Sequence, residues 1–270
     1  MKEKGYLLAF LAAALITVGL RVYQILCLTD YETGFILPER YSAAVIVTVF
    51  IALVILLSAF LLYASTKGGK KSGTFHIMPS LFSFVLGVVM ASQPLVSFTG
   101  VPVLLKILCV AFAVLSALYF IAFSVRAVAH FSFSPYFAVI PAAFFVFKSA
   151  CVAIRNAYHT VISDTVFEII AYCFIMLFFL EFARAANGIS SKRSVRKFVA
   201  AGSVASLLSI AFSVPRLVIP LFSSSAVHGV SVNDFMILFT GIYIACEILT
   251  RPLFVQNGDE KVSLYYVGKH

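Results

Sequence analysis

The chain has 270 residues, of which 62% are hydrophobic and only 11% are charged, and its mean hydropathy is +1.05. About 25% of the residues of a typical soluble domain are charged, so this composition excludes an ordinary soluble domain with a polar surface. In a soluble chain the net charge of +9 would suggest nucleic-acid binding. Here the basic residues flank long apolar runs, where anionic lipid headgroups are the natural partner, and no nucleic acid is expected.

Eight continuous apolar runs follow one another along the chain, and each is typical of a helix that faces lipid on its whole circumference. Gln93 and Pro94 weaken the third run, so a re-entrant segment, or seven spans in all, is the alternative there. We expect an all-α fold, a polytopic membrane helix bundle that forms one transmembrane domain over residues 1–270. The eight predicted helices cover residues 5–27, 43–65, 80–98, 105–125, 135–156, 164–186, 198–222 and 233–250.

The charged residues between these runs predict the orientation of the bundle. With the N-terminus in the cytosol, the inner side holds fourteen basic and five acidic residues and the outer side holds six of each. The whole net charge of +9 then lies inside, which follows the positive-inside rule and places both termini in the cytoplasm. The partners expected on that side are the lipid bilayer and its anionic headgroups. Short loops without an Asn-x-Ser/Thr sequon favour a bacterial inner membrane.

Ionisable side chains inside a membrane span are costly and usually face a partner or a watery cavity. Lys148 and Arg155 lie on one face of the fifth predicted helix, and Glu168 and Tyr172 lie at a similar depth on the sixth. One interpretation is a structural ion pair between Glu168 and either base, and another is that the bases reach for the headgroups. The functional interpretation adds Arg216 and predicts a cationic pocket, open to the outer face, for a carboxylate or phosphate ligand.

The seventh predicted helix carries a stripe of hydroxyl side chains that leads to Arg216. Ser203, Ser206, Ser209 and Ser213 advance by three or four residues, so they lie on one face of the helix. As the lining of a path, these hydroxyls would hydrate a solute on its way through the membrane. As a packing surface, small residues let two helices approach closely, which is the commoner use of such stripes.

Two other polar groups are expected to have structural roles. Gln93 is expected to form an amide hydrogen bond to another helix, and Glu181 is expected to pair with Arg184 three residues later. The five cysteines lie in or beside apolar runs without metal-ligand spacing, so they are expected to act as small packing residues.

The chain contains none of the short motifs that hold a catalytic metal, a nucleotide or a nucleophilic serine. We therefore predict no catalytic residue, no metal site and no cofactor. The function expected first is a transporter or permease-like protein that takes a small or amphiphilic anion through the outer pocket. The alternative is a non-catalytic membrane subunit or sensor that docks on a partner membrane protein. A membrane-embedded enzyme acting on lipid is a third class, without a supporting motif.

Overall fold

The computed structural model describes residues 2–29, 36–65, 77–95, 100–129, 135–156, 163–186, 192–222, 231–250, 255–256 and 262–263. Nearly all of this described part of the chain is helical. The α-helices are α1 (Lys2–Tyr23), α2 (Tyr41–Ser65), α3 (Ile77–Ala91), α4 (Val103–Ala129), α5 (Val139–Asn156), α6 (Ser163–Ala186), α7 (Lys192–Phe222) and α8 (Val232–Thr250). Shorter elements are the π-helical turn η1 (Gln24–Leu28), the 3-10 turns η2 (Pro38–Arg40), η3 (Gln93–Leu95) and η4 (Pro135–Ala138), and the antiparallel strands β1 (Val255–Gln256) and β2 (Val262–Ser263).

Each of the eight predicted runs overlaps one of these α-helices, which confirms the helical prediction for the described residues. The third run differs from the prediction in its length. α3 ends at Ala91, and the chain continues as the 3-10 turn η3, which contains Gln93 and Pro94. Proline lacks a backbone N–H and its ring collides with the preceding turn, so an α-helix is unfavourable here. The predicted helix over residues 80–98 is therefore wrong at its C-terminal end.

In the described residues, six helical segments are long and apolar enough to cross a membrane, which supports a membrane-embedded helix bundle. α3 has 15 residues and α5 has 18, and neither is among the six. At about 1.5 Å per residue, α3 is about 22 Å long, which is shorter than a hydrocarbon core of about 30 Å. Eight spans therefore stay a prediction, as does the cytoplasmic location of both chain ends. The six segments are Leu7–Leu28, Pro38–Ala64, Val103–Val125, Asp164–Arg184, Arg196–Pro220 and Val232–Leu249.

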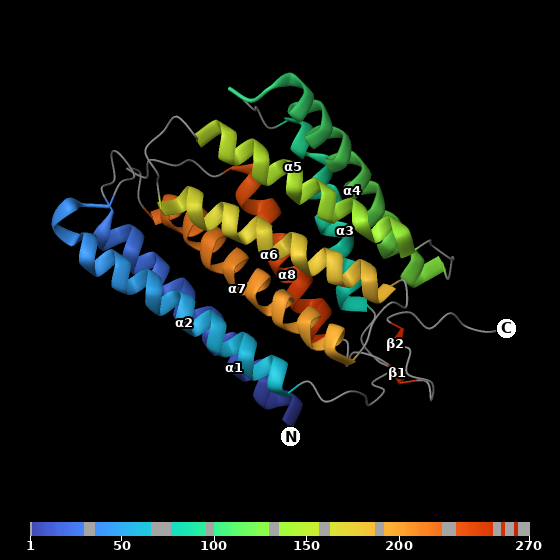
Figure 1. Cartoon of the computed structure of the whole chain (residues 1–270), viewed down its shortest axis with the longest axis horizontal. Helices are drawn as coiled ribbons and strands as arrows, with labels where there is room; N and C mark the ends of the chain where they lie inside the picture. Colours follow the sequence, from blue (N-terminus) through green and yellow to red (C-terminus); the bar gives the residue numbers. More distant parts are fainter. Residues whose placement is uncertain are drawn as a thin grey trace.

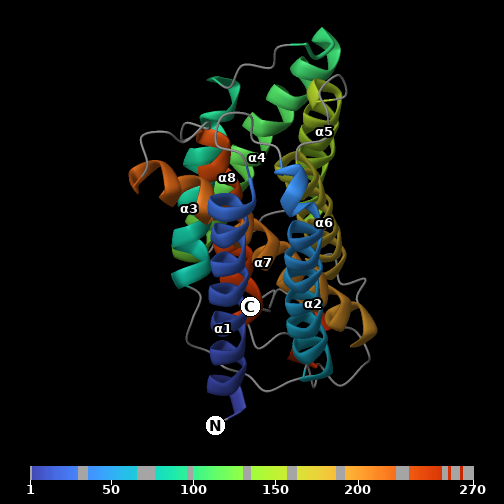
Figure 2. The same cartoon turned by 90° about the vertical axis from the view of Figure 1, so that its left-hand side faces the viewer.

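α7 is the central helix of the bundle and contacts α1, α2, α6 and α8. α1 and α2 pack together along one flank of α7, whereas α3 and α4 lie on the far side, against α8 and α5 respectively (Figure 1). Figure 2 shows α1 and α2 side by side in front of α7. Within an 18-residue apolar stretch of each segment, the buried share of residues is 78% for α7 but only 28% for α1 and 22% for α2. α1 and α2 therefore turn most of their surface outwards.

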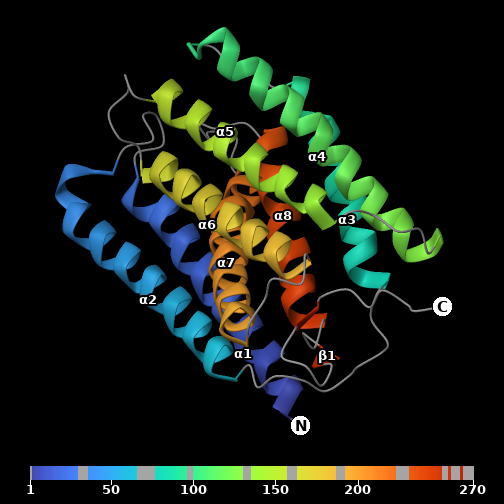
Figure 3. The ribbon, with the colours of Figure 1, turned by 45° about the vertical axis from the view of Figure 1, so that its right-hand side comes forward.

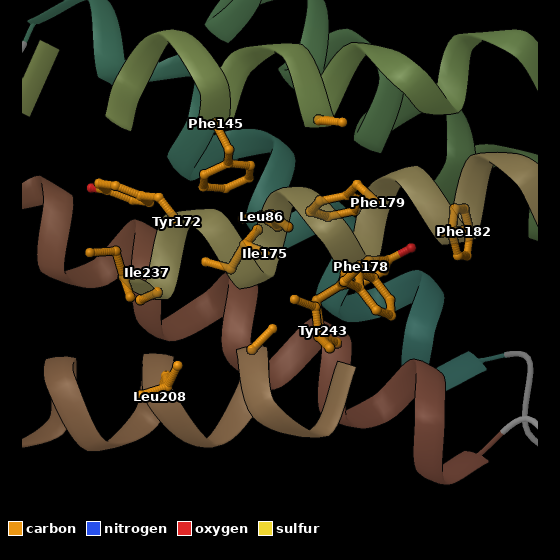
Figure 4. Close-up of a cluster of buried hydrophobic side chains, with 14 of the residues drawn as sticks. Leu86, Phe145, Tyr172, Ile175, Phe178, Phe179, Phe182, Leu208, Ile237 and Tyr243 are labelled. Atoms are coloured by element: carbon orange, nitrogen blue, oxygen red, sulfur yellow. The ribbon is translucent and has the colours of Figure 1, made fainter. Parts of the chain in front are cut away.

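Aromatic rings from several helices form the core beside α7 (Figure 4). The ring of Phe179 in α6 stacks on Phe145 of α5 at 5.9 Å and on Tyr243 of α8 at 6.3 Å between ring centroids. Phe178 lies 4.8 Å from Phe198 of α7 by the same measure. These distances are typical of favourable aromatic pairs. Because lipid tails are as apolar as these side chains, such close packing, rather than exclusion of water, holds membrane helices together.

Two glycines allow neighbouring helices to approach closely. A Cβ atom added at Gly241 in α8 would lie 2.7 Å from the Cβ of Ser209 and 3.3 Å from the carbonyl oxygen of Ser206, both in α7. A Cβ added at Gly87 in α3 would lie 3.1 Å from the carbonyl oxygen of Ala117 in α4. A side chain at either position would therefore push two helix backbones apart.

The start of α1 and the end of α8 lie at the same end of the bundle (Figure 3). At the opposite end α1 and α7 finish, and α6 and α8 begin. We call this opposite end the polar end, because the buried charged side chains described next lie there.

Candidate functional site

A set of polar side chains, here named the polar layer, lies inside the bundle toward its polar end. Each member forms a hydrogen bond or an ion pair with another member. The members come from η1, η3, the residue before α8 and every α-helix except α3 and α4. Several of the members have almost no exposed surface. The members are Arg21, Gln24, Thr48, Gln93, Lys148, Asp164, Glu168, Tyr172, Arg216, Ser231, Asn233 and Asp234.

Arg21, near the end of α1, is 2% exposed and forms an ion pair with Asp164 in the first turn of α6. Its Nη1 donates a hydrogen bond to Oε1 of Gln24 at 2.5 Å, and its guanidinium lies 4.3 Å from the ring centroid of Phe167. Gln24 in turn donates from Nε2 to Oγ1 of Thr48 in α2 at 3.0 Å. This chain of contacts ties α1 to both α2 and α6.

The π-helical turn η1 begins with the buried residue Gln24, directly after Tyr23 and three residues after Arg21. A π-turn adds one residue to the helical turn and changes the direction of the side chains that follow. Such turns are frequent at functional sites, and this one holds the amide that binds Arg21.

Arg216 and Asp234 form a second ion pair, between α7 and α8, with 3.4 Å between Nη1 and Oδ1. The guanidinium of Arg216 also lies 4.8 Å from the ring centroid of Phe212, one turn earlier. Asp234 accepts hydrogen bonds at Oδ2 from the hydroxyl of Ser231 at 2.7 Å and from the Ser231 backbone N–H at 3.1 Å. The backbone N–H of Asp234 donates to Oγ of Ser231, so the two residues form a capping box at the start of α8.

Glu168, Tyr172 and Asn233 form a triad between α6 and α8. Oε1 of Glu168 accepts hydrogen bonds from the Tyr172 hydroxyl at 2.9 Å and from Nδ2 of Asn233 at 2.7 Å. The same hydroxyl lies 3.0 Å from Oδ1 of Asn233, which is a second acceptor for it. Glu168 is 5% exposed and Tyr172 is fully buried.

Lys148 of α5 donates a hydrogen bond from Nζ to Oε1 of Gln93 in η3 at 3.0 Å. This contact confirms the amide hydrogen bond to another helix that was predicted for Gln93. Lys148 is 2% exposed, and its charge also acts on those of Glu168 and Arg155. The ion pair that the sequence suggested between Glu168 and either base is not formed among the described residues, because Glu168 contacts Tyr172 and Asn233 instead.

The four serines of the predicted stripe are fully buried in α7. The hydroxyl of Ser206 donates to the carbonyl oxygen of Gly241 in α8 at 2.7 Å, and this hydrogen bond joins the two helices. Ser203, Ser209 and Ser213 donate to carbonyl oxygens of α7 itself. This geometry has the form of a packing surface, and the role of these serines as the lining of a path stays a prediction.

Of the five predicted ligand-binding residues, the structure brings Lys148, Glu168, Tyr172 and Arg216 into the polar layer. Arg155 is half-buried at the edge of the layer and has no ion pair within the described part of the chain. The predicted pair of Glu181 and Arg184 is confirmed, with 3.0 Å between Oε1 and Nη1, far from the polar end.

Sequence reasoning did not include Arg21, Asp164, Asn233 or Asp234 in the site. Arg21 could have been included, because an arginine near the end of an apolar run needs a partner. The two aspartates lie in the first turns of α6 and α8, where acids are common for helix capping alone. Their pairing with arginines depends on which helices are neighbours, and a single sequence does not contain that information.

More hydrogen-bond donors than acceptors of the polar layer are left without a partner among the described residues. Within the described residues, Nε of Arg21, Nε2 of Gln93 and Nε of Arg216 are buried without a hydrogen-bond partner. Among these residues, Oδ1 of Asp234 is the one acceptor of the layer that is buried without a hydrogen-bond partner, and it lies in the ion pair with Arg216. Buried polar groups are almost always hydrogen-bonded, so these N–H groups call for acceptor oxygens from water or a ligand. No group of three or more metal-ligating side chains occurs in the described part.

No model of a protein family matches the chain, and neither a curated protein nor a solved structure is significantly similar to it. The function proposed below therefore rests on the geometry of the polar layer.

Proposed function

We propose that the protein is a permease-like membrane transporter that binds a small or amphiphilic anion in the polar layer. In this proposal all eight helices cross a bacterial inner membrane, both chain ends are cytoplasmic, and the polar end faces outwards. The distribution of basic residues in the sequence supports this orientation, since the excess of Lys and Arg belongs to the loops at the other end. η3 extends the short helix α3 toward the polar end.

The observation that carries the proposal is the set of buried N–H groups without acceptors on Arg21, Gln93 and Arg216. Arginine presents its donors in a planar fork that matches the oxygens of a carboxylate or phosphate. Arg21 and Arg216 are near enough for their charges to repel each other, and an anion between them would relieve that repulsion. Cations held inside a membrane protein commonly mark the route of an anion for the same reason.

Uptake into proteoliposomes tests the proposal with three radiolabelled probes: acetate, inorganic phosphate and octanoate. We expect wild-type protein to carry at least one of them, and Arg216→Gln to lower its rate by about tenfold or more, the loss typical of one charge-assisted hydrogen bond. Arg184→Gln is the matched control, because Arg184 is exposed and pairs with Glu181 at the other end of the bundle. Its rate should equal that of wild type.

Arg155→Gln is the second variant, because Arg155 is half-buried and its loss breaks no ion pair of the described residues. Its uptake rate should fall while its melting temperature stays that of wild type. Absence of uptake of all three probes by folded wild-type protein would contradict the proposal. Equal uptake by wild type, Arg155→Gln and a folded Arg216→Gln protein would contradict the assignment of the site.

A non-catalytic subunit or sensor is the second candidate, and the outward-facing α1–α2 pair favours it. Only 28% and 22% of the residues in an 18-residue stretch of these two segments are buried, so a large apolar surface is available to a partner membrane protein as well as to lipid. Purification from native membranes in a mild detergent tests this candidate. A stoichiometric partner that is lost when Leu8 and Leu15, both exposed on α1, are replaced by Ala would support it.

A further inference from the structure

The charges of the polar layer are balanced when every member is ionised. Three basic and three acidic side chains take part in its ion pairs and hydrogen bonds, whereas Arg155 lies at the edge of the layer and adds a positive charge that acts on Lys148. The members themselves then add no net attraction for a monovalent anion to that of Arg155, although they have unsatisfied N–H donors. Anion binding would therefore be favoured by the loss of one negative charge. The six side chains are Arg21, Lys148, Arg216, Asp164, Glu168 and Asp234.

Glu168 differs from the two aspartates of the layer in its partners. Asp164 and Asp234 each form an ion pair with an arginine. Glu168 is bonded by two neutral groups, the Tyr172 hydroxyl and the Asn233 amide, and has no ion pair within the described residues. Neutral partners hold a carboxyl group in either charge state, so Glu168 is the acid of the layer best placed to change its protonation.

The triad also offers a second hydrogen-bond arrangement. The Tyr172 hydroxyl has one proton but two acceptors in reach, Oε1 of Glu168 at 2.9 Å and Oδ1 of Asn233 at 3.0 Å. With Glu168 ionised, the hydroxyl donates to the carboxylate. With Glu168 protonated, the hydroxyl donates to Asn233 and its oxygen is free to accept from the new carboxyl O–H. Both states of Glu168 therefore find their hydrogen-bond partners without any movement of α6 or α8.

We propose that Glu168 is the proton-binding residue of this transporter, so that one proton and one monovalent anion are carried together. The carboxylate takes up a proton from the aqueous phase at the polar end, its charge changes from negative to neutral, and the layer gains a single positive charge. The anion then restores neutrality, and release of both on the other side returns the original state. The coupling to an anion rests on the proposed function, whereas proton binding by Glu168 does not.

The charged and titratable groups around Glu168 come from α6 itself and from α1, α5, α7 and α8. Lys148 on α5 is a basic group whose charge interacts with that of Glu168, and Arg155 lies at the edge of the layer on the same helix. Arg21 on α1 forms its ion pair with Asp164, and Arg216 on α7 forms its ion pair with Asp234. Tyr172 is the titratable partner on α6 itself. The charge of Asp234 on α8 also acts on Tyr172.

Infrared difference spectroscopy across an acid-to-alkaline titration tests proton binding in the purified full-length protein. We expect a carbonyl-stretch band of a buried protonated carboxyl group that appears on acidification. Glu168→Gln should lose this band. Glu181→Gln is the matched control, since it makes the same change on the same helix in a pair with an exposed arginine, and it should keep the band. A band that is identical in wild type and Glu168→Gln would overturn the proposal.

Tyr172→Phe gives a second test that leaves Glu168 in place. Removal of the hydroxyl takes away the oxygen that accepts from the O–H of protonated Glu168, so the band should shift in frequency. An unshifted band in the folded variant would overturn the role of the triad, even if Glu168→Gln does not fold.

Transport of protons separates this inference from the function on which it rests. A pH-sensitive dye trapped in proteoliposomes should report one proton taken up with each probe anion, and Glu168→Gln should no longer respond to a pH gradient. Anion uptake without protons would overturn the inference and leave the proposed function intact. A carboxyl band that titrates in a protein that carries no probe anion would overturn the proposed function and leave proton binding by Glu168 intact.

Discussion

Replacement of Asp164 by Asn is expected to lower the free energy of unfolding by about 3 kcal/mol. The substitution keeps the size of the side chain but leaves Arg21, which is 2% exposed, without its counter-charge. Loss of one partner of a buried ion pair is costly because the remaining charge cannot be solvated. Asp164 retains 23% exposure, so the lower end of the usual range applies. Thermal or denaturant unfolding in detergent measures this change.

Two controls show whether the loss of stability comes from the burial of the ion pair or from the loss of any ion pair. Glu181→Gln breaks the pair with Arg184, whose side chain is 56% exposed, and should cost less than about 1 kcal/mol. The double replacement of Arg21 by Met and Asp164 by Leu removes both charges and should be far less costly than Asp164→Asn alone. Equal stability of Asp164→Asn and wild type would mean that Arg21 and Asp164 do not form a buried pair.

Replacement of Gly241 by Leu is expected to destabilise the bundle by about 3 kcal/mol. Even the first atom of the new side chain would lie 2.7 Å from the Cβ of Ser209 and 3.3 Å from the carbonyl oxygen of Ser206. α7 and α8 would have to separate, and the hydrogen bond from Ser206 to the Gly241 carbonyl oxygen would lengthen or break. The unfolding midpoint in detergent and the yield of folded protein measure the effect.

Gly19→Leu is the matched control for this contact. Gly19 lies in α1, and a Cβ added there would have no atom within 4 Å. The same substitution should therefore be neutral, or slightly stabilising because leucine is a better helix former than glycine. Equal losses at Gly19 and Gly241 would show that the two helices do not approach each other as described.

The helical elements could be predicted from the sequence because membrane helices need long apolar runs. The run over 164–186 matches α6 (Ser163–Ala186), and the run over 233–250 matches α8 (Val232–Thr250), to within one residue at each end. The end of α3 was not predicted, although Pro94 was recognised as a weak point. Apolar residues continue past Pro94 in the sequence, so composition did not indicate where the helix geometry changes.

The candidate site was predicted in part. Lys148, Glu168, Tyr172 and Arg216 were selected because polar residues in apolar runs are exceptional, and the structure places all four in the polar layer. Their partners were not predicted correctly, since Glu168 contacts Asn233 on α8 and Arg216 contacts Asp234. These pairs depend on where α8 lies relative to α6 and α7, which a single sequence does not contain.

The most direct test of this account is the side of the membrane on which the polar end lies. Alkaline phosphatase, which is active only outside the cytoplasm, and green fluorescent protein, which fluoresces in the cytoplasm, are fused in turn to chains that end between α6 and α7 or between α5 and α6. We predict fluorescence for fusions that follow Ala186 and phosphatase activity for fusions that follow Asn156. The reverse pattern, or cytoplasmic signals at both positions, would contradict an outward-facing polar layer in a bundle of membrane-spanning helices.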